Sequence, residues 1–407
     1  MPGALEGFRI VDLTQGLCGP FASMRLGDAG AEIIKIEPLI GETSRTMGPP
    51  FIGDESAVFL SLNRNKKSVA VDLATADGQE LVRKLVAQAD VILEDLGPGK
   101  AEKIGLGYGD LSPTNPTLVY CAISAYGEEG PLRDLPGAEL VVQAMADYTH
   151  SLGKIGAAPV RLGADVASLN TGIMASQAVT AGLFHRVRTG EGQRIAVSML
   201  GTLLHMRGIM WTAMTDPDEW YGFHLDHYTR PPDEGYKTKD GHVYFGLRRG
   251  SSEDWDRLML KLGLEEYIAD PRFEGFGREA TSIGRHAPEV KPIWEQAFQK
   301  LSNEEVVKLI HEFRGDAVPF NTYPSLFAHP QLDELDIVKE VEHPASAAGG
   351  SFRTIGPVWH FTDTPAEIHS PPPVLGQHTD EILTRIGLSA TDLQQLREAG
   401  VLNPFVR

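Results

Sequence analysis

The sequence has few cysteines and lacks long apolar runs. Only Cys18 and Cys121 occur in 407 residues, and their wide separation indicates neither a disulfide framework nor a zinc site. Nowhere do about 18 apolar residues follow one another, as a membrane-spanning helix requires. The opening MPGALEGFRI has neither the basic nor the apolar region of a signal peptide. We therefore expect a cytoplasmic protein that is neither exported nor membrane-spanning.

Positive charge is also scarce. Against 55 Asp and Glu stand 37 Lys and Arg, a formal net charge of -18. This field repels nucleic acids and anionic membranes, and no basic patch interrupts it. The hydrophobic fraction of 42% and the charged fraction of 23% are ordinary for a folded globular protein. The length predicts two domains, or one large domain with an insertion.

The first 200 residues alternate short β-branched runs with helical patterns. This alternation of strand and helix patterns predicts parallel βαβ units, and therefore an α/β fold. One helix is marked by an apolar stripe on Leu81, Val82, Leu85, Val86 and Ala89, with Thr75 placed to cap it. The predicted strands are 8–13, 31–37, 68–73, 90–95 and 117–126.

The amino-acid composition changes near residues 214–240, which are rich in aromatics, proline and acids. Such a segment is typical of a long connection and predicts a domain boundary. A further α+β segment runs to about residue 325, and a proline-rich stretch then leads to a helix near Thr379.

Three local motifs carry little chemistry by themselves. The glycines of GLGYG at 105–109 lack the strand and helix of a dinucleotide loop. His224 and His227 have HxxH spacing but no zincin glutamate, so solvated loop histidines are the better interpretation. NRNKKSV at 63–69 fits equally a solvated turn or a loop that recognises phosphate.

Segments along nearly the whole chain resemble, in the right order, the family III (CaiB-BaiF) coenzyme A-transferases. The first is GFRIVDLTQGLCGPFASMRLGDAGAEIIKIEP at 7–38, followed by FLSLNRNKKSVAVDL at 59–73 and ADVILEDLGPGKAEKIGL at 89–106. The last is PPPVLGQHTDEIL at 371–383, which is similar to the family's P-x-L-G-x-H-T-D-x-x-L signature.

The resemblance implies a Rossmann-like large domain with a smaller α+β domain inserted, in subunits that interlock as dimers. It divides the chain into a large-domain part at 1–213, a linker and small domain at 214–325, and a C-terminal part at 326–407 that returns to the large domain. Coenzyme A or acyl-CoA is the implied substrate, with no metal and no nucleotide redox cofactor. Asp95 stands where the family commonly has Asn, and its charge near the CoA phosphates would weaken binding; Lys103 stands where Arg is common. The implied CoA contacts are Leu17, Cys18, Leu62, Asn63, Arg64, Asn65, Lys66, Asp95, Leu96, Lys103 and Met199.

PVRLGADVASLNTGIMASQAV at 159–179 resembles the family's active-site segment, in which an aspartate stands four residues before a glycine. Here Ser168 occupies that position. The implied mechanism needs a carboxylate that attacks the thioester to form an acyl anhydride, and then an enzyme-CoA thioester. A serine forms neither intermediate, because its hydroxyl would give a less reactive ester and would need a general base.

Two nearby acids need their own interpretation. Asp165 shares a helix face with position 168 and could substitute as the nucleophile, although an acid at a helix start is the more ordinary interpretation. Glu139 stands where active transferases often carry an acid bordering the site, and it could equally be a helix-start acid.

We therefore predict a non-catalytic subunit of a heteromeric CoA-transferase, paired with a paralogous catalytic subunit in a heterodimer or heterotetramer. By resemblance to a two-subunit branch of anaerobic toluene degradation, CoA would move between a succinyl-CoA-like donor and an acid such as benzylsuccinate. The alternatives are an active homodimer that uses Asp165 and a CoA-binding structural protein. A related racemase is disfavoured because Gly137, Ala138 and Glu139 replace its G-H-D segment.

Overall fold

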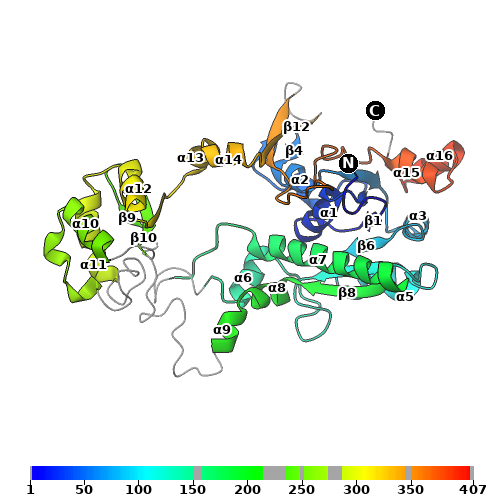
Figure 1. Cartoon of the computed structure of the whole chain (residues 1–407). Helices are drawn as coiled ribbons and strands as arrows, with labels where there is room; N and C mark the ends of the chain where they lie inside the picture. Colours follow the sequence, from blue (N-terminus) through cyan, green and yellow to red (C-terminus); the bar gives the residue numbers. More distant parts are fainter. Residues whose placement is uncertain are drawn as a thin grey trace. The chain divides into compact units, whose positions relative to one another are not determined.

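The computed structural model describes residues 2–149, 158–213, 235–247, 252–273, 287–343 and 350–403. The chain forms two compact units (Figure 1). The large unit comprises Met1–Tyr148, Arg161–Arg207 and Asp333–Arg407, and the small unit comprises Thr149–Val160 and Gly208–Leu332. The predicted boundaries after residues 213 and 325 differ from these divisions, and Thr149–Val160 was predicted to belong to the large domain. His224 and His227 lie outside the described residues.

A six-stranded parallel sheet forms the centre of the large unit, with the order β5-β2-β1-β6-β7-β8. β1 pairs with β2 on one side, where Ile10 faces Ile33, and with β6 on the other, where Ile10 faces Val91. The α/β prediction is therefore confirmed. The strands are β1 (Arg9–Asp12), β2 (Glu32–Glu37), β5 (Lys66–Ala70), β6 (Val91–Glu94), β7 (Val119–Ser124) and β8 (Gln193–Ser198).

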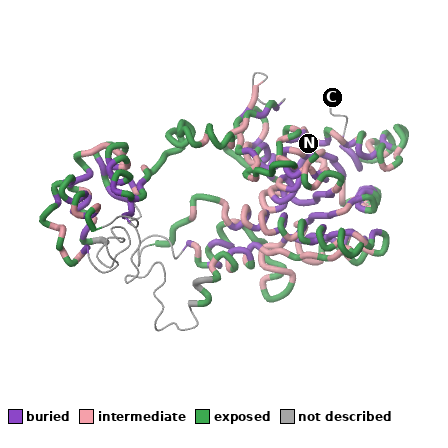
Figure 2. The backbone as a smooth tube through the Cα atoms, in the orientation of Figure 1, coloured by how far each residue is buried: buried purple, intermediate pink, exposed green. Residues whose placement is uncertain are grey.

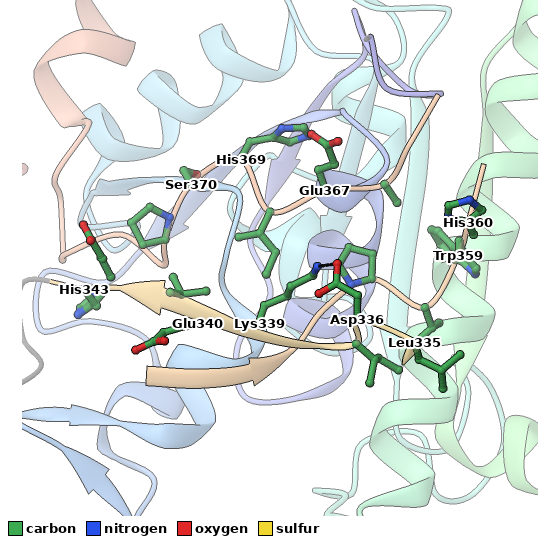
Figure 3. Close-up of a pocket in the computed structure, with 18 of the residues that line it drawn as sticks. Leu335, Asp336, Lys339, Glu340, His343, Trp359, His360, Glu367, His369 and Ser370 are labelled. Atoms are coloured by element: carbon green, nitrogen blue, oxygen red, sulfur yellow. Dashed lines mark hydrogen bonds and ion pairs between the residues drawn. The ribbon is translucent and has the colours of Figure 1, made fainter. Parts of the chain in front are cut away.

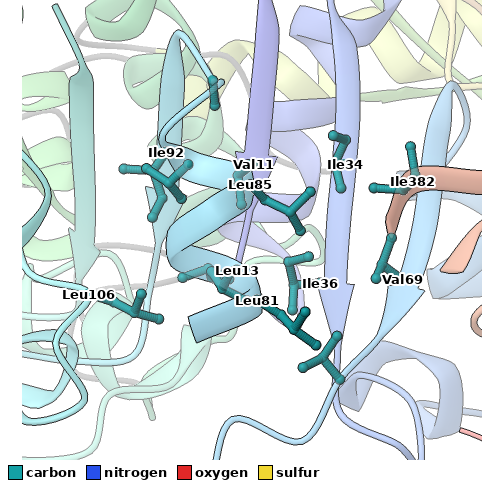
Figure 4. Packing of buried hydrophobic residues seen from close by; sticks show 14 of the residues in the cluster. Val11, Leu13, Ile34, Ile36, Val69, Leu81, Leu85, Ile92, Leu106 and Ile382 are labelled. Carbon is teal, nitrogen blue, oxygen red and sulfur yellow. The ribbon is translucent and has the colours of Figure 1, made fainter. Parts of the chain in front are cut away.

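Successive residues of the central strands face opposite sides of the sheet, and both sides are covered by helices. On one side, Ile10 and Ile33 pack with residues of α1 (Cys18–Asp28) and α7 (Val166–Thr189). On the other side, Val11 and Ile34 pack with residues of α3 (Ala76–Val86), α15 (Thr379–Arg385) and α16 (Ala390–Glu398) (Figure 4). The predicted helix is α3, and the Thr75 hydroxyl accepts a hydrogen bond from the backbone N–H of Gly78 as expected of its cap.

The C-terminal segment returns to the large unit, beside strand β5. Asn65 has a left-handed φ of 60°, and its side-chain oxygen accepts hydrogen bonds from the backbone N–H groups of His369 and Ser370. Further along, the backbone N–H of Ala70 donates to the Thr379 hydroxyl. Val71 forms an isolated antiparallel bridge with Leu402, so the C-terminal segment lies against the edge of the sheet just beyond β5.

The small unit is built on an antiparallel sheet with the order β11-β10-β9. Its core is aromatic: the Trp294 ring centroid lies 5.0 Å from that of Phe245 and 5.8 Å from that of Phe298. The elements are β9 (Tyr236–Lys237), β10 (His242–Gly246), α10 (Ser252–Leu262), η3 (Glu265–Tyr267), η4 (Pro271–Phe273), α11 (Ala287–Phe298), α12 (Asn303–Glu312) and β11 (Asp316–Pro319).

The remaining elements are short. Among the described residues, no helix combines the length and apolar character needed to cross a membrane. Figure 2 shows buried residues concentrated along the strands of the large unit and within the small unit. The short remaining elements are η1 (Thr43–Thr46), β3 (Phe51–Ile52), β4 (Glu55–Ser56), α2 (Ala57–Leu62), α4 (Lys100–Lys103), α5 (Tyr108–Leu111), α6 (Glu139–Met145), α8 (Met199–Met206), α9 (Gly208–Ala213), α13 (Tyr323–Phe327), α14 (Pro330–Glu334), β12 (Val338–Glu342) and β13 (Ser351–Ile355).

Candidate active site

The strand order reverses direction at β1. The chain runs outward from β1 through β2 to β5, and then resumes at β6 on the other side of β1. Such a reversal opens a crevice beyond the carboxyl ends of the two central strands, which is where open α/β sheets bind ligands. The loop after β1 and the residues after β6 meet here, because both Asp95 carboxylate oxygens accept from the backbone N–H of Gln15, at 3.1 and 3.0 Å.

Three charged side chains are buried below this crevice. The Lys66 ammonium lies 3.4 Å from the Asp12 carboxylate, and the Lys35 ammonium lies 4.0 Å from it. Burial by itself would raise the pKa of Asp12, but the two lysines and hydrogen bonds from Ser23 and Thr14 lower it to about 2. Burial lowers the pKa of Lys66 to about 7, against the opposing attraction of Asp12. These charges fix the loop after β1, because Lys35 also donates to the Thr14 carbonyl.

The start of α7 carries Ser168 on a buried face, with 4% of the residue exposed. The first turn of a helix has backbone N–H groups without helical partners. Here Glu139, the first residue of α6, supplies the acceptors: its carboxylate oxygens lie 2.8 Å from the Ala167 nitrogen and 2.7 Å from the Ser168 nitrogen. A carboxylate at this place also faces the positive end of the helix dipole. Glu139 therefore fixes the backbone at position 168.

Gln143 was not singled out by the sequence, and it supports this arrangement. Its side-chain nitrogen donates to the Glu139 carboxylate at 2.7 Å and to the Ala164 carbonyl at 3.3 Å. The residue is fully buried, and its side-chain oxygen has no hydrogen-bond partner in the described structure. The signal in the sequence was the spacing of four between Glu139 and Gln143, which places both on one face of α6.

Cys18 begins α1 opposite Ser168. A Cβ atom at Gly172, one turn after Ser168, would lie 2.6 Å from the Cys18 carbonyl oxygen, so α1 and α7 approach closely at this end. Burial raises the pKa of the Cys18 thiol to about 12, against an opposing hydrogen bond with Ser168. Met199, at the start of α8, belongs to the same apolar cluster as Ala167 and Cys18. The structure thus brings together four of the predicted site residues: Cys18, Glu139, Ser168 and Met199.

Asp165 lies at the N-cap of α7, as expected of a helix-start acid, but its side chain makes no capping hydrogen bond. Its carboxylate lies 3.5 Å from the Arg161 guanidinium, and the side chain is 42% exposed. Ser168, by contrast, is almost fully buried. The two candidates for the nucleophile position therefore occupy different environments.

The NRNKKSV segment interacts mainly with the interior of the large unit. Lys66 donates to the Pro20 carbonyl at 2.9 Å and to the Asn63 side-chain oxygen at 2.8 Å. Arg64 forms a two-pronged pair with Asp28, with both contacts at 2.8 Å. These contacts join the end of α2 to α1 and β5. A role of this segment in CoA binding stays a prediction.

The remaining predicted contacts surround the crevice. Burial raises the pKa of Asp95 to about 8, so at neutral pH this carboxyl is largely protonated and resembles the asparagine expected there. Leu17 caps α1 and Leu62 ends α2. The Leu96 backbone N–H donates to Glu94. Lys103, the last residue of α4, is exposed.

Two of the pockets formed by described residues of the large unit lie away from this crevice. The larger, of about 1340 Å³, is lined by β12 and the segment from Pro357 to Pro371 (Figure 3). Its lining includes five acids and a single lysine, Lys339, which pairs with Asp336 (Figure 3). Among the residues that the structure describes, no group of three or more His, Cys, Asp or Glu could hold a metal ion.

Relatives of the chain share its length and architecture. It is 34% identical to the succinyl-CoA:glutarate CoA-transferase of Homo sapiens, over 98% of this chain and 90% of that protein. It is 28% identical to the beta subunit of a succinyl-CoA–L-malate CoA-transferase of Chloroflexus aurantiacus, over 98% of both chains. The crystal structure of a CAIB/BAIF family protein from Brucella suis superimposes with a TM-score of 0.82 at 27% identity, covering 95% of this chain and all of that one.

The family model of CoA-transferase family III matches residues 5–379. This range includes the loop after β1, the start of α7 and the N-terminal part of the C-terminal return. With these relatives and this architecture, the chain belongs to the family III CoA-transferases.

Proposed function

We propose that the chain is a non-catalytic subunit of a CoA-transferase that moves CoA between an acyl-CoA and a carboxylic acid. The named transferases among its relatives support the reaction class. The observation that carries the non-catalytic role is the serine at position 168, at the buried start of α7. The reaction needs a carboxylate there, because only a carboxylate forms the acyl anhydride that CoA thiolate can open.

No nearby acid offers a ready replacement. Both Glu139 oxygens accept hydrogen bonds from the backbone of α7, at 2.8 and 2.7 Å, so an attack by Glu139 would uncap the helix. The Asp165 carboxylate pairs with Arg161 on the exposed side of the N-terminus of α7. The two groups at Ser168 that could act as a general base are not poised for it: both Glu139 oxygens accept hydrogen bonds from the α7 backbone, and burial keeps the Cys18 thiol protonated.

A paralogous subunit with an intact carboxylate would supply the chemistry. The relative from Chloroflexus aurantiacus is named as one subunit of a transferase, which is a precedent for assembly from distinct chains. We propose succinyl-CoA or a similar thioester as the donor and a dicarboxylic acid such as benzylsuccinate as the acceptor. Interlocking of the two chains would bury large surfaces, and the folded state of one subunit would then depend on the other.

The test measures acyl transfer from succinyl-CoA to benzylsuccinate and to glutarate. The purified chain is assayed alone, and together with a family III chain encoded nearby in the same genome. We expect activity only in the mixture. Turnover by the chain alone, abolished by Asp165→Ala, would instead establish an active homodimer that uses Asp165. Calorimetric titration with CoA separates a CoA-binding subunit from a purely structural one.

The variant Ser168→Asp sharpens the test. Glu139 already fixes the backbone at position 168, so the new carboxylate would be attached to a backbone that is held in place. We expect the variant alone to gain measurable transferase activity and to accumulate a CoA thioester detectable by mass spectrometry. Ser168→Asn is the matched control, since it adds similar volume without a nucleophilic oxygen, and it should stay inactive.

A further inference from the structure

A second pocket in the large unit combines three arginines, Arg25, Arg64 and Arg353, and one acid, Asp28, with an apolar lining. It has a volume of about 470 Å³, and α1, α2, β13 and the segment up to Trp359 surround it. That volume falls in the range of small-molecule sites, which are concave and mostly apolar with a few polar groups. The apolar lining includes Met24, Ile52, Leu60, Phe352 and Val358.

Arg25 is the polar group that distinguishes this pocket. Its guanidinium carbon lies 4.2 Å from the ring centroid of Trp359 and 5.7 Å from that of Phe21. The Nε atom donates to the Ser176 hydroxyl at 3.3 Å. Among the described residues, no acceptor or carboxylate pairs with its Nη1 and Nη2 groups. The forked face of the guanidinium is therefore available to an anion.

Asp28, which lines the same pocket, offsets the charge of Arg25 only in part. Asp28 attracts Arg25, but Arg64 donates to both of its carboxylate oxygens at 2.8 Å, and Asn65 donates to one of them at 2.9 Å. Burial lowers the pKa of Arg25 and Asp28 raises it, yet a guanidinium stays protonated at every physiological pH. Arg353 at the rim adds a further positive charge. A partly buried cation whose acidic neighbour is shared with a second arginine keeps excess positive charge, and a bound anion would offset its cost.

The adjoining acidic pocket provides a contrast. Pro357, Val358 and Trp359 line both pockets, so the two share one wall. The larger pocket carries Glu340 and Glu367 and repels anions. Anion selectivity is therefore confined to the Arg25 side of this wall.

We propose that the pocket at Arg25 binds a small organic carboxylate with an apolar body. The guanidinium would hold the carboxylate in a two-pronged pair, while the body would pack against Met24, Leu60 and Phe352. Ser176 lies eight residues after Ser168 on the same helix, so the Arg25 contact on α7 lies roughly 12 Å along the helix from Ser168. The pocket is a second site, and the proposal stands whether or not the chain transfers CoA.

The experiment is calorimetric titration of the full chain with 3-phenylpropanoate and with its uncharged amide, 3-phenylpropanamide. We expect one carboxylate per chain and an affinity for the amide that is weaker by about tenfold or more, which is the loss of one charged pair. Arg25→Gln should weaken carboxylate binding by the same factor and leave amide binding unchanged. Arg353→Gln, at the exposed rim, should change affinity by about threefold or less.

Four outcomes would overturn the proposal: no carboxylate binding at millimolar concentration, equal binding of the amide, full binding by Arg25→Gln, or a loss in Arg353→Gln as large as in Arg25→Gln. Circular dichroism verifies that each variant is folded. If Arg25→Gln does not fold, Arg25→Lys keeps the charge and removes the fork, and Trp359→Leu removes the ring beside it. Each should then weaken carboxylate binding, and unchanged binding in both would equally contradict the site.

Discussion

The two units of the chain bury different kinds of side chain. The large unit buries charges, including Asp12, Lys35 and Lys66 below the crevice. Among the described residues of the small unit, none of the buried side chains is charged, and its core is a cluster of aromatic rings around Trp294. Buried charges are costly unless they are paired, whereas the polar cost of the aromatic core is smaller: the buried Trp294 indole N–H, which has no hydrogen-bond partner in the described structure. The charges of the large unit hold the loop after β1 in one position, because Lys35 donates to the Thr14 carbonyl and also pairs with Asp12.

The largest effect on stability is expected from Trp294→Ala. Trp294 is fully buried and contacts Phe245, Phe298 and Trp255, so truncation should cost about 3–5 kcal/mol. Hydrogen exchange followed by mass spectrometry should show the loss of protection in α10, α11 and α12. Trp211→Ala, at a side chain that is 60% exposed, is the control and should cost about 0.5 kcal/mol or less. Equal effects of the two variants would mean that the aromatic core does not stabilise the small unit.

The corresponding change in the large unit is Lys66→Met. It leaves Asp12 with one lysine and removes the donor to Pro20 and Asn63, and should cost about 3 kcal/mol. Lys67→Met is the matched control: this neighbour is 33% exposed and pairs with Glu32 and Glu381 at the surface, where about 0–1 kcal/mol is expected. Denaturant unfolding measures both. A stabilising Lys66→Met would show that the charge cluster is maintained at a cost to stability.

A smaller loss of folding stability is expected from Glu139→Ala, which removes the acceptor for two backbone N–H groups of α7. The cost should be about 2 kcal/mol, at the upper end for a helix cap. Glu139→Gln keeps one acceptor oxygen and should lose roughly half as much. If Ala and Gln cost the same, the charge of Glu139, rather than its hydrogen bonds, holds the start of α7.

The small unit offers a comparable cap on an exposed helix. Ser302 and Glu305 form a reciprocal capping box at the start of α12. Ser302→Ala should cost about 1 kcal/mol, less than Glu139→Ala because water can replace the lost acceptor. Thermal unfolding monitored by circular dichroism measures the difference, and a larger loss at Ser302 would reverse the comparison.

The last effect depends on pH and is measured as a slope of stability rather than as a loss at one pH. Burial raises the pKa of Asp95 to about 8, so the folded chain holds a proton that the unfolded chain releases near pH 4. The stability that this proton contributes is present at low pH and is lost as the pH rises toward 8. Asp95→Asn removes this dependence, so wild type should lose stability relative to the variant between pH 5 and 8, with a constant difference above pH 8. Parallel curves would place the Asp95 pKa near its ordinary value.

Local patterns predicted the strands that are buried on both faces. β7 is a nearly continuous apolar run, which signals a parallel sheet directly. In β2 three isoleucines carry that signal, although Lys35 and two glutamates interrupt it. β8 was not predicted, because QRIAVS lies at the sheet edge and is mostly only partly buried. The return of the C-terminal segment was implied by the family resemblance, not by any local pattern.

The site was predictable only in part. The serine at position 168 and the acid at 139 were recognised from their segments, and the structure places them in contact. The burial of Lys66 could not be inferred, because its partners Asp12 and Pro20 are distant in sequence. The Arg25 pocket could not be predicted either, because Arg25 and Trp359 are more than 300 positions apart in the sequence and only the fold brings them into contact.

The pinning of the C-terminal segment against β5 has a consequence for biosynthesis. When a ribosome has completed residue 198, all six strands of the central sheet exist, but the segments that contact Asn65, Ala70 and Val71 are about 170 to 200 residues away. Until then the nascent chain carries an open sheet edge, the kind of surface on which unfinished proteins associate. Premature termination before residue 369 would thus yield a product with its sheet assembled and its edge unprotected, a ready substrate for chaperones and proteases.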